Sequence, residues 1–229
     1  MFFIIFFSEM RAIIECVIGK IGMVALKRRD FLKNLILLGT GSVLLPQLWT
    51  VKAAEAAWKT DGNAVGGRDP LLGIPIQETD FEFSSLQNRE TTDAIVIHHV
   101  GNTNRDVSAA EIDRWHKNNG WAGIGYHFVI RKDGTIERGR PMDMLGAHCY
   151  GENWHTIGVN IVGEFDGHEP EPEQMVSAAK LLAALCRYYG FAPDRKHIVG
   201  HRDFNSTACP GQNLYDKLPR LVTMTRKYY

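Results

Sequence analysis

The stretch AIVIHHV (residues 94–100) is a short apolar run rich in β-branched residues, and two histidines lie near its end. Such a run is typical of a buried strand. Side chains alternate between the two faces of a strand, so His98 and His99 are expected on opposite faces of the sheet. Only one of these two imidazoles can therefore face a site on a given side of the sheet.

The segments that follow this strand alternate between helix and strand patterns. Ser108 and Glu111 form a capping-box pattern, which predicts the start of a helix. Residues 126–138 predict a hairpin that turns at Asp133 and Gly134. Two more strands are expected over 156–163 and 197–201. Two more helices are expected over 172–190 and 212–227. This order predicts an α/β fold in which helices flank a mixed central β-sheet on both faces.

The loop GHRDFNSTACPG (residues 200–211) follows the last of these strands and holds a histidine and a cysteine. His201 and Cys209 are eight positions apart, which is too far for one helical turn or a tight hairpin to pair them. Catalytic zinc takes three protein ligands, usually imidazole nitrogen or thiolate, and leaves one position for water. We interpret the loop as two ligands of a zinc site whose third ligand comes from a distant strand end. His98 and His99 are both candidates, and spacing does not choose between them.

The composition argues against several other classes of protein. The chain has 229 residues, of which 26 are basic and 26 acidic, so its formal net charge is zero. A nucleic-acid partner is not expected, because nothing in this balance attracts a polyanion. The four cysteines show no CxxC spacing, so no disulfide framework is expected. We interpret Cys149 and Cys186 as buried thiols.

Residues 1–57 are interpreted as an N-terminal extension followed by a signal peptide. The segment 27–57 has a basic start, an apolar run too short to span a membrane, and small residues after it. Arg28-Arg29 resembles the start of a twin-arginine signal, which exports proteins already folded. We expect a periplasmic or extracellular protein that meets the membrane only through this segment, if the segment is not cleaved.

The remaining chain divides into a linker and one domain. Residues 58–79 are rich in glycine and proline, and we interpret them as a linker without a core of its own. The domain is expected over 80–229, which is an ordinary size for a single domain. We expect it to be a monomer.

Four segments of the chain resemble the N-acetylmuramoyl-L-alanine amidases of the phage-lysozyme and peptidoglycan-recognition-protein family. They are TTDAIVIHHVGNT (91–103), EIDRWHKNNGWAGIGYHFVIRKDGTIERGR (111–140), GAHCYGENWHTIGVNIVGEF (146–165) and VGHRDFNSTACPG (199–211). Their order and approximate spacing are those of the family. The resemblance implies the fold of that family and hydrolysis of the amide between N-acetylmuramic acid and L-alanine. Peptidoglycan or muropeptides are the implied partners.

The resemblance also implies a zinc site. One zinc ion would be held by His98, His201 and Cys209, so the resemblance selects His98 over His99. Zinc lowers the pKa of bound water from about 16 to roughly 7, so a zinc-bound water would be the nucleophile.

Two further positions match catalytic residues of the family. Tyr126 matches a tyrosine whose hydroxyl lies beside the metal-bound water. Thr207 occupies the place of a lysine in the phage enzymes, and its hydroxyl can donate a hydrogen bond to an oxyanion but brings no charge. Cytoplasmic relatives carry a glutamate where Asn160 stands here, so the group that takes the proton stays open.

Three residues are expected to bind substrate. His148 falls in a loop that lies along the substrate groove in the family, although it could instead stabilise that loop. Trp121 and Trp154 lie in loops beside the predicted site, where their rings could stack on sugar or close the core beneath. The alternative function is a non-catalytic peptidoglycan-binding module, because relatives that lack the cysteine ligand keep the fold and the groove.

Overall fold

The computed structural model describes residues 69–229, which form a mixed five-stranded sheet in the order β3-β2-β4-β1-β5. The strands are β1 (Ala94–His99), β2 (Phe128–Ile130), β3 (Ile136–Arg138), β4 (Thr156–Ile161) and β5 (Ile198–Gly200). β1 runs parallel to both of its neighbours, β4 and β5, and β2 runs parallel to β4. β2 and β3 are antiparallel, as the predicted hairpin requires. The predicted mixed sheet is therefore confirmed.

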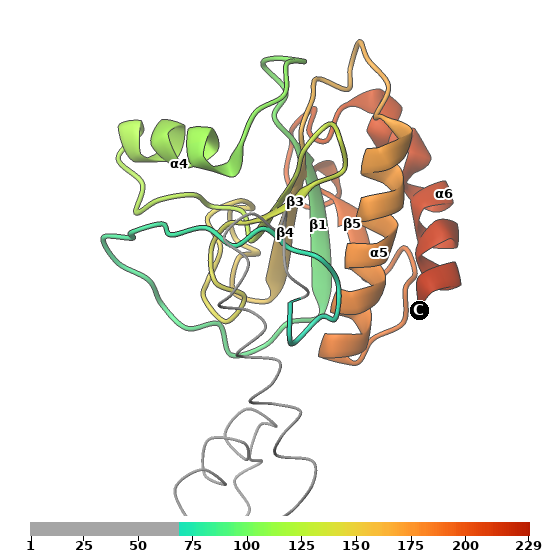
Figure 1. Cartoon of the computed structure of the whole chain (residues 1–229), viewed down its shortest axis with the longest axis horizontal. Helices are drawn as coiled ribbons and strands as arrows, with labels where there is room; N and C mark the ends of the chain where they lie inside the picture. The colour runs from blue at the N-terminus through green and yellow to red at the C-terminus, as the bar shows by residue number, and fades with distance from the viewer. Residues whose placement is uncertain (1–68) are drawn as a thin grey trace, which may run out of the picture. The chain divides into compact units, whose positions relative to one another are not determined.

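Helices cover both faces of this sheet. They are α4 (Ala109–Asn118), α5 (Pro172–Tyr189), α6 (Gln212–Tyr228) and the short 3-10 helix η1 (His201–Asp203). Figure 1 shows α5 and α6 side by side against one face, with α4 on the other side of the sheet. Within residues 69–229, no helix is long and apolar enough to cross a membrane.

The helix ends lie where the sequence predicts them. Ser108 caps α4, and its hydroxyl accepts a hydrogen bond from the Glu111 backbone N–H at 3.2 Å. Gly190 ends α5 with a φ of 80°, a left-handed conformation that glycine adopts without steric cost. Local signals of this kind place both helices before any tertiary contact is considered.

The apolar core has two layers, one on each side of the sheet. The larger lies between the sheet and the pair α5 and α6, and includes Ile95 and Ile97 of β1. The smaller lies under α4 and includes Ile112 and Val129. Because side chains alternate between the two faces of β1, Ile95 and Ile97 both lie on the side of the sheet that α5 and α6 cover.

The prediction that residues 58–79 form a linker is wrong for the part that the structure describes. Leu72 and Ile76 are 5% and 1% exposed and belong to the larger core. The backbone of Gln77 bonds both to Ile136 and to Arg138, each at 2.8 Å. Glycine and proline mark turns in this segment, but its apolar residues are still buried. Residues 58–68 and the predicted signal peptide lie outside the described residues.

Two adjacent leucines test whether this segment is part of the domain. Leu72→Ala should lower the free energy of unfolding by about 2 to 4 kcal/mol, because it leaves a cavity in the core. Leu71 is 59% exposed, so Leu71→Ala should change the free energy by less than about 0.5 kcal/mol. Urea unfolding of the two variants measures both values. Equal effects would show that the segment does not pack on the domain.

Candidate active site

The two histidines at the end of β1 point to opposite faces of the sheet, as predicted. The ring of His99 stacks on Phe165 with centroids 6.0 Å apart, and Phe165 belongs to the core under α5 and α6. The ring of His98 lies on the other face, 4.5 Å from the ring of His201 and 5.1 Å from that of Tyr126. His98 therefore faces the loop that follows β5, and His99 does not.

The three predicted metal ligands lie close together in the structure. They are His98, His201 and Cys209. One nitrogen of each imidazole and the Cys209 sulfur all lie within 4.8 Å of one another. Among residues 69–229, this is the one group of His, Cys, Asp or Glu side chains arranged to hold a metal ion. The sheet explains the convergence, since β5 is parallel to β1 and His201 directly follows the end of β5.

The donor set fits a tetrahedral zinc site. His98 Nδ1 and Cys209 Sγ are 3.6 Å apart. Zinc–sulfur and zinc–nitrogen bonds of about 2.3 and 2.0 to 2.1 Å, set at a tetrahedral angle, would separate these two atoms by about 3.6 Å. Two nitrogens and one sulfur leave the fourth position of such an ion for a non-protein ligand.

Burial keeps all three groups neutral. It holds the pKa of His98 well below its usual range and lowers the pKa of His201. Both imidazoles are therefore uncharged and offer a lone pair. Burial also raises the pKa of the Cys209 thiol to about 12. A cation is what would stabilise the thiolate, because a coordinating thiol is deprotonated outright.

Each of the two histidines has a hydrogen-bond partner on its other nitrogen. His98 Nε2 lies 3.1 Å from His148 Nδ1, and His201 Nε2 lies 3.0 Å from Asn205 Oδ1. Nδ1 of each imidazole is thus left for a metal. Asn205 is not among the residues predicted from the sequence, although its place four residues after His201 in the same loop could have indicated it.

His148 turns inward and contacts His98. Its ring is only 8% exposed, one nitrogen bonds to His98, and the other, Nε2, is buried. This burial favours the alternative, that His148 stabilises its loop, and substrate binding by His148 stays a prediction. Nothing in the one-dimensional pattern of the loop shows that this side chain turns inward.

Tyr126, Asn160 and Thr207 surround the three donors. Burial raises the pKa of Tyr126, so its hydroxyl stays protonated and can donate a hydrogen bond. Asn160 is the partner of His98 in the pairing of β1 with β4, and its side chain is fully buried. Thr207 is exposed, and its hydroxyl oxygen accepts a hydrogen bond from the Cys209 N–H at 3.2 Å.

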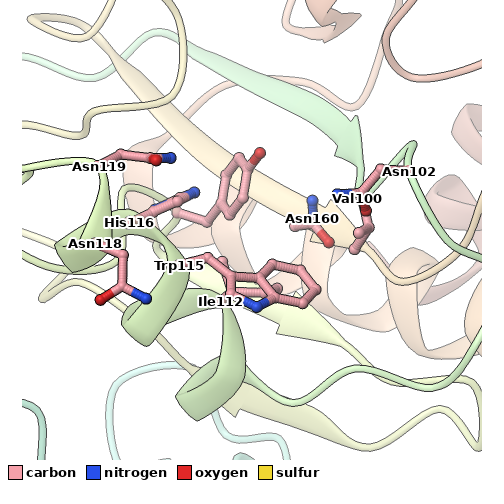
Figure 2. Close-up of a pocket in the computed structure, with 9 residues that line it drawn as sticks. Val100, Asn102, Ile112, Trp115, His116, Asn118, Asn119 and Asn160 are labelled. Carbon is pink, nitrogen blue, oxygen red and sulfur yellow. The ribbon is translucent and has the colours of Figure 1, made fainter.

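A cavity of about 400 Å³ adjoins the three donors, because Tyr126 and Asn160 form part of its wall. Figure 2 shows Trp115 and His116 of α4 on one side and Asn160 with Asn102 on the other. The walls carry four amides and three rings, from Asn102, Asn118, Asn119, Asn160, Trp115, His116 and Tyr126. A wall of this kind can hydrogen-bond an uncharged polar ligand and stack against it.

Of the two tryptophans predicted to bind substrate, Trp121 packs beside a residue of the cavity wall. Trp121 is 45% exposed, and its ring lies 4.5 Å from that of His116 in the cavity wall. Trp154 is 58% exposed, its ring lies 4.4 Å from that of His155, and it does not line the cavity. Cys149 and Cys186 are buried free thiols, as predicted.

Comparison with known proteins identifies the family. Residues 88–212, just over half of the chain, match the family described as N-acetylmuramoyl-L-alanine amidase. The chain belongs to this amidase family. The endolysin of Enterobacteria phage K11 is 38% identical over 147 residues, which are 61% of this chain and 95% of the endolysin.

Solved structures agree with this assignment. The N-acetylmuramoyl-L-alanine amidase LysC from Clostridium intestinale is 35% identical with a TM-score of 0.59, over 65% of this chain and 97% of LysC. Peptidoglycan recognition proteins LCa and LCx, solved as a complex with tracheal cytotoxin, match with 25% identity and a TM-score of 0.55. That match covers 62% of this chain and 92% of the other. The predicted fold and enzyme class are confirmed.

His116, which lines the cavity, should stay unprotonated down to a lower pH than an exposed histidine. Burial lowers the pKa of His116 to about 4, and Arg140 adds to the effect. An unfolded chain binds a proton there near pH 6.5, so stability from this group is present above that pH and is lost as the pH falls toward 4. Side-chain NMR should give His116 a midpoint near 4. A midpoint close to 6.5 would mean that the ring is solvated.

Proposed function

We propose that this amidase depends on one zinc ion to hydrolyse the amide between N-acetylmuramic acid and L-alanine in peptidoglycan, with water as the nucleophile. The observation that carries the proposal is the convergence of donor atoms from His98, His201 and Cys209 within 4.8 Å. Zinc, when bound, would lower the pKa of water and polarise the amide carbonyl.

The three ligands fix the charge of the centre. His98 and His201 are neutral donors, and Cys209 contributes one negative charge as a thiolate. A divalent ion held by this set keeps a net single positive charge, which favours an oxyanion nearby. The rigid ends of β1 and β5 keep the imidazoles in place, so little reorganisation is needed as charge develops.

Tyr126 and Thr207 are proposed to donate hydrogen bonds to the oxygen of the substrate carbonyl. Tyr126 keeps its proton because burial raises its pKa, and its ring lies 5.1 Å from that of His98. We assign it to donate a hydrogen bond to the oxygen of the cleaved amide. The exposed Thr207 hydroxyl can donate a second hydrogen bond there, because its contact with the Cys209 N–H uses only the oxygen.

Muropeptides are the proposed ligand of the cavity. Its amide-lined wall matches the peptide and acetamido groups of peptidoglycan, which are uncharged and rich in hydrogen-bonding atoms. Trp121 stands at the edge of this wall, where a sugar or peptide can stack on it. The likeness to a recognition-protein complex with tracheal cytotoxin supports this choice.

The matched pair His98→Ala and His99→Ala tests the metal site. His98→Ala should lose bound zinc and reduce the rate of stem-peptide release on the order of 10³-fold, because a ligand is removed. His99→Ala should retain zinc, since His99 faces the other side of the sheet. Metal analysis and mass spectrometry of digested sacculi measure both properties. Cys209→Ser should resemble His98→Ala.

Two outcomes would overturn the proposal. If His99→Ala loses zinc while His98→Ala retains it, the ligand assignment is wrong. If the unaltered protein binds muropeptides but holds no zinc and releases no stem peptide, the chain is the non-catalytic binding module instead.

We also propose that the chain is exported through a twin-arginine signal in residues 27–57. The support is the pair Arg28-Arg29 before an apolar run that is too short to span a membrane. In a bacterial host, the chain should reach the periplasm in a processed form. Replacing both arginines by lysine should leave the chain unprocessed in the cytoplasm. Export that is unchanged in this double variant would refute the signal.

A further inference from the structure

The ring of His148 lies in a slot that two glycines create. A Cβ atom at Gly146 would come within 2.3 Å of His148 Cδ2, and one at Gly158 within 2.5 Å of His148 Cγ. Real Cβ atoms do not approach other atoms so closely, so any larger residue at either place would displace the ring. The slot holds an imidazole in one orientation, with Nδ1 toward His98.

This orientation determines which nitrogen of His98 carries the proton. His98 Nδ1 faces Cys209 Sγ at 3.6 Å, and His98 Nε2 faces His148 Nδ1 at 3.1 Å. Nδ1 must be free of a proton to bind a metal, so Nε2 carries the proton and donates it to His148 Nδ1. Without an acceptor at this place, His98 Nε2 would be a buried donor without a partner.

The second imidazole is held from the same loop. His201 Nε2 donates to Asn205 Oδ1, which also accepts a hydrogen bond from the Cys149 thiol at 3.2 Å. Asn205 Nδ2 donates to the Tyr150 carbonyl at 3.1 Å, so the amide cannot flip without losing contacts. Both metal-binding imidazoles are thus connected to residues 148–150.

The loop itself is fixed from within. The side-chain oxygen of Asn153 accepts hydrogen bonds from the backbone N–H groups of His148 and Cys149, at 2.9 and 3.0 Å. These contacts hold the start of the loop while the two glycines hold the ring of His148. A loop restrained in this way can orient its neighbours.

We propose that residues 146–153 form an outer shell that sets both zinc-binding histidines in the Nε2-protonated tautomer. His148 is the positioning residue for His98, and Asn205, anchored by this loop, is the positioning residue for His201. The inference rests on the proposed zinc site and adds to it the part of the chain that controls metal affinity. Outer-shell partners of this type typically change metal affinity by about 10- to 100-fold.

The first test uses the zinc-free protein and reads the tautomer directly. Side-chain ¹⁵N NMR of the unaltered chain at neutral pH should show His98 protonated on Nε2 alone. His148→Leu should give a mixture of both tautomers, because the acceptor is gone. His148→Asn places an amide oxygen close to the position of Nδ1 and should restore the single tautomer. A single tautomer in His148→Leu would overturn the proposal.

The second test measures zinc affinity by competition with a chelator. His148→Leu should bind zinc about 10- to 100-fold more weakly, and His148→Asn should recover most of the loss. Asn205→Ala, in a surface loop, tests the other imidazole if His148→Leu does not fold, and its zinc affinity should fall about 10-fold.

A buried residue of α5 that contacts none of the three donors supplies the control. Gln174 is fully buried, and its side chain donates to the Val162 carbonyl at 2.8 Å. Gln174→Leu should lower stability but leave zinc affinity unchanged. If it weakens zinc binding as much as His148→Leu does, the effect is one of general stability and the outer-shell role is wrong.

These outcomes are separate from those of the proposed function. An unaltered protein that binds no zinc refutes the zinc site itself. An unaltered protein that binds zinc tightly, with His148→Leu and Asn205→Ala equal to it, leaves the zinc site intact and refutes only the outer shell.

Discussion

The parallel pairing of β1 with β5 is the constraint on which the site depends. In this register Ile97 lies opposite Gly200, so His98 and His201 leave their strands at the same edge of the sheet. A slip of β1 by one residue would turn His98 toward α5 and α6 and bring His99 to the loop. The core prevents this slip, because Ile95 and Ile97 are buried on the α5 and α6 side. Packing of Ile95 and Ile97 on one face of the sheet thereby determines that His98, and not His99, faces the loop after β5.

The second constraint is electrostatic. The site places two imidazoles, a thiol and a phenol in a largely buried region, where charged forms are costly. Each group responds by staying neutral, with a lowered pKa for His98 and raised pKa values for Cys209 and Tyr126. Neutral imidazoles are metal ligands and a neutral phenol is a hydrogen-bond donor, so burial gives the two imidazoles and Tyr126 the protonation states that the proposed mechanism needs. Cys209 differs, because its thiol would lose the proton only to a bound cation. The core supplies the stability that offsets the burial of these polar groups.

Much of the fold follows from local signals, and these could be read from the sequence. β-branched runs indicate β1 and β4, a serine cap indicates α4, and a glycine in the left-handed region ends α5. The pattern of alternation also separates His98 from His99. It does not reveal which of them faces the loop, because that depends on the face that α5 and α6 cover. A resemblance to a family was needed to choose between them.

Other features depend on residues far apart in the chain, and local reasoning failed there. Leu72 and Ile76 belong to the core because strands and helices later in the sequence create the surface that they cover. The slot of His148 is formed by Gly146 and by Gly158, which lies across the loop on β4, so neither glycine alone predicts it. Asn205 gains its role only once the loop after β5 is folded beside Tyr150.

Anomalous X-ray diffraction at the zinc absorption edge, on crystals of the protein purified without chelators, would locate the metal and its ligands. We expect one zinc peak bound by His98 Nδ1, His201 Nδ1 and Cys209 Sγ at about 2.0 to 2.3 Å, with a non-protein ligand in the fourth position. A peak at other side chains, a fourth ligand from the protein, or a hydrolytically active crystal without zinc would show that these three side chains do not form a catalytic zinc site.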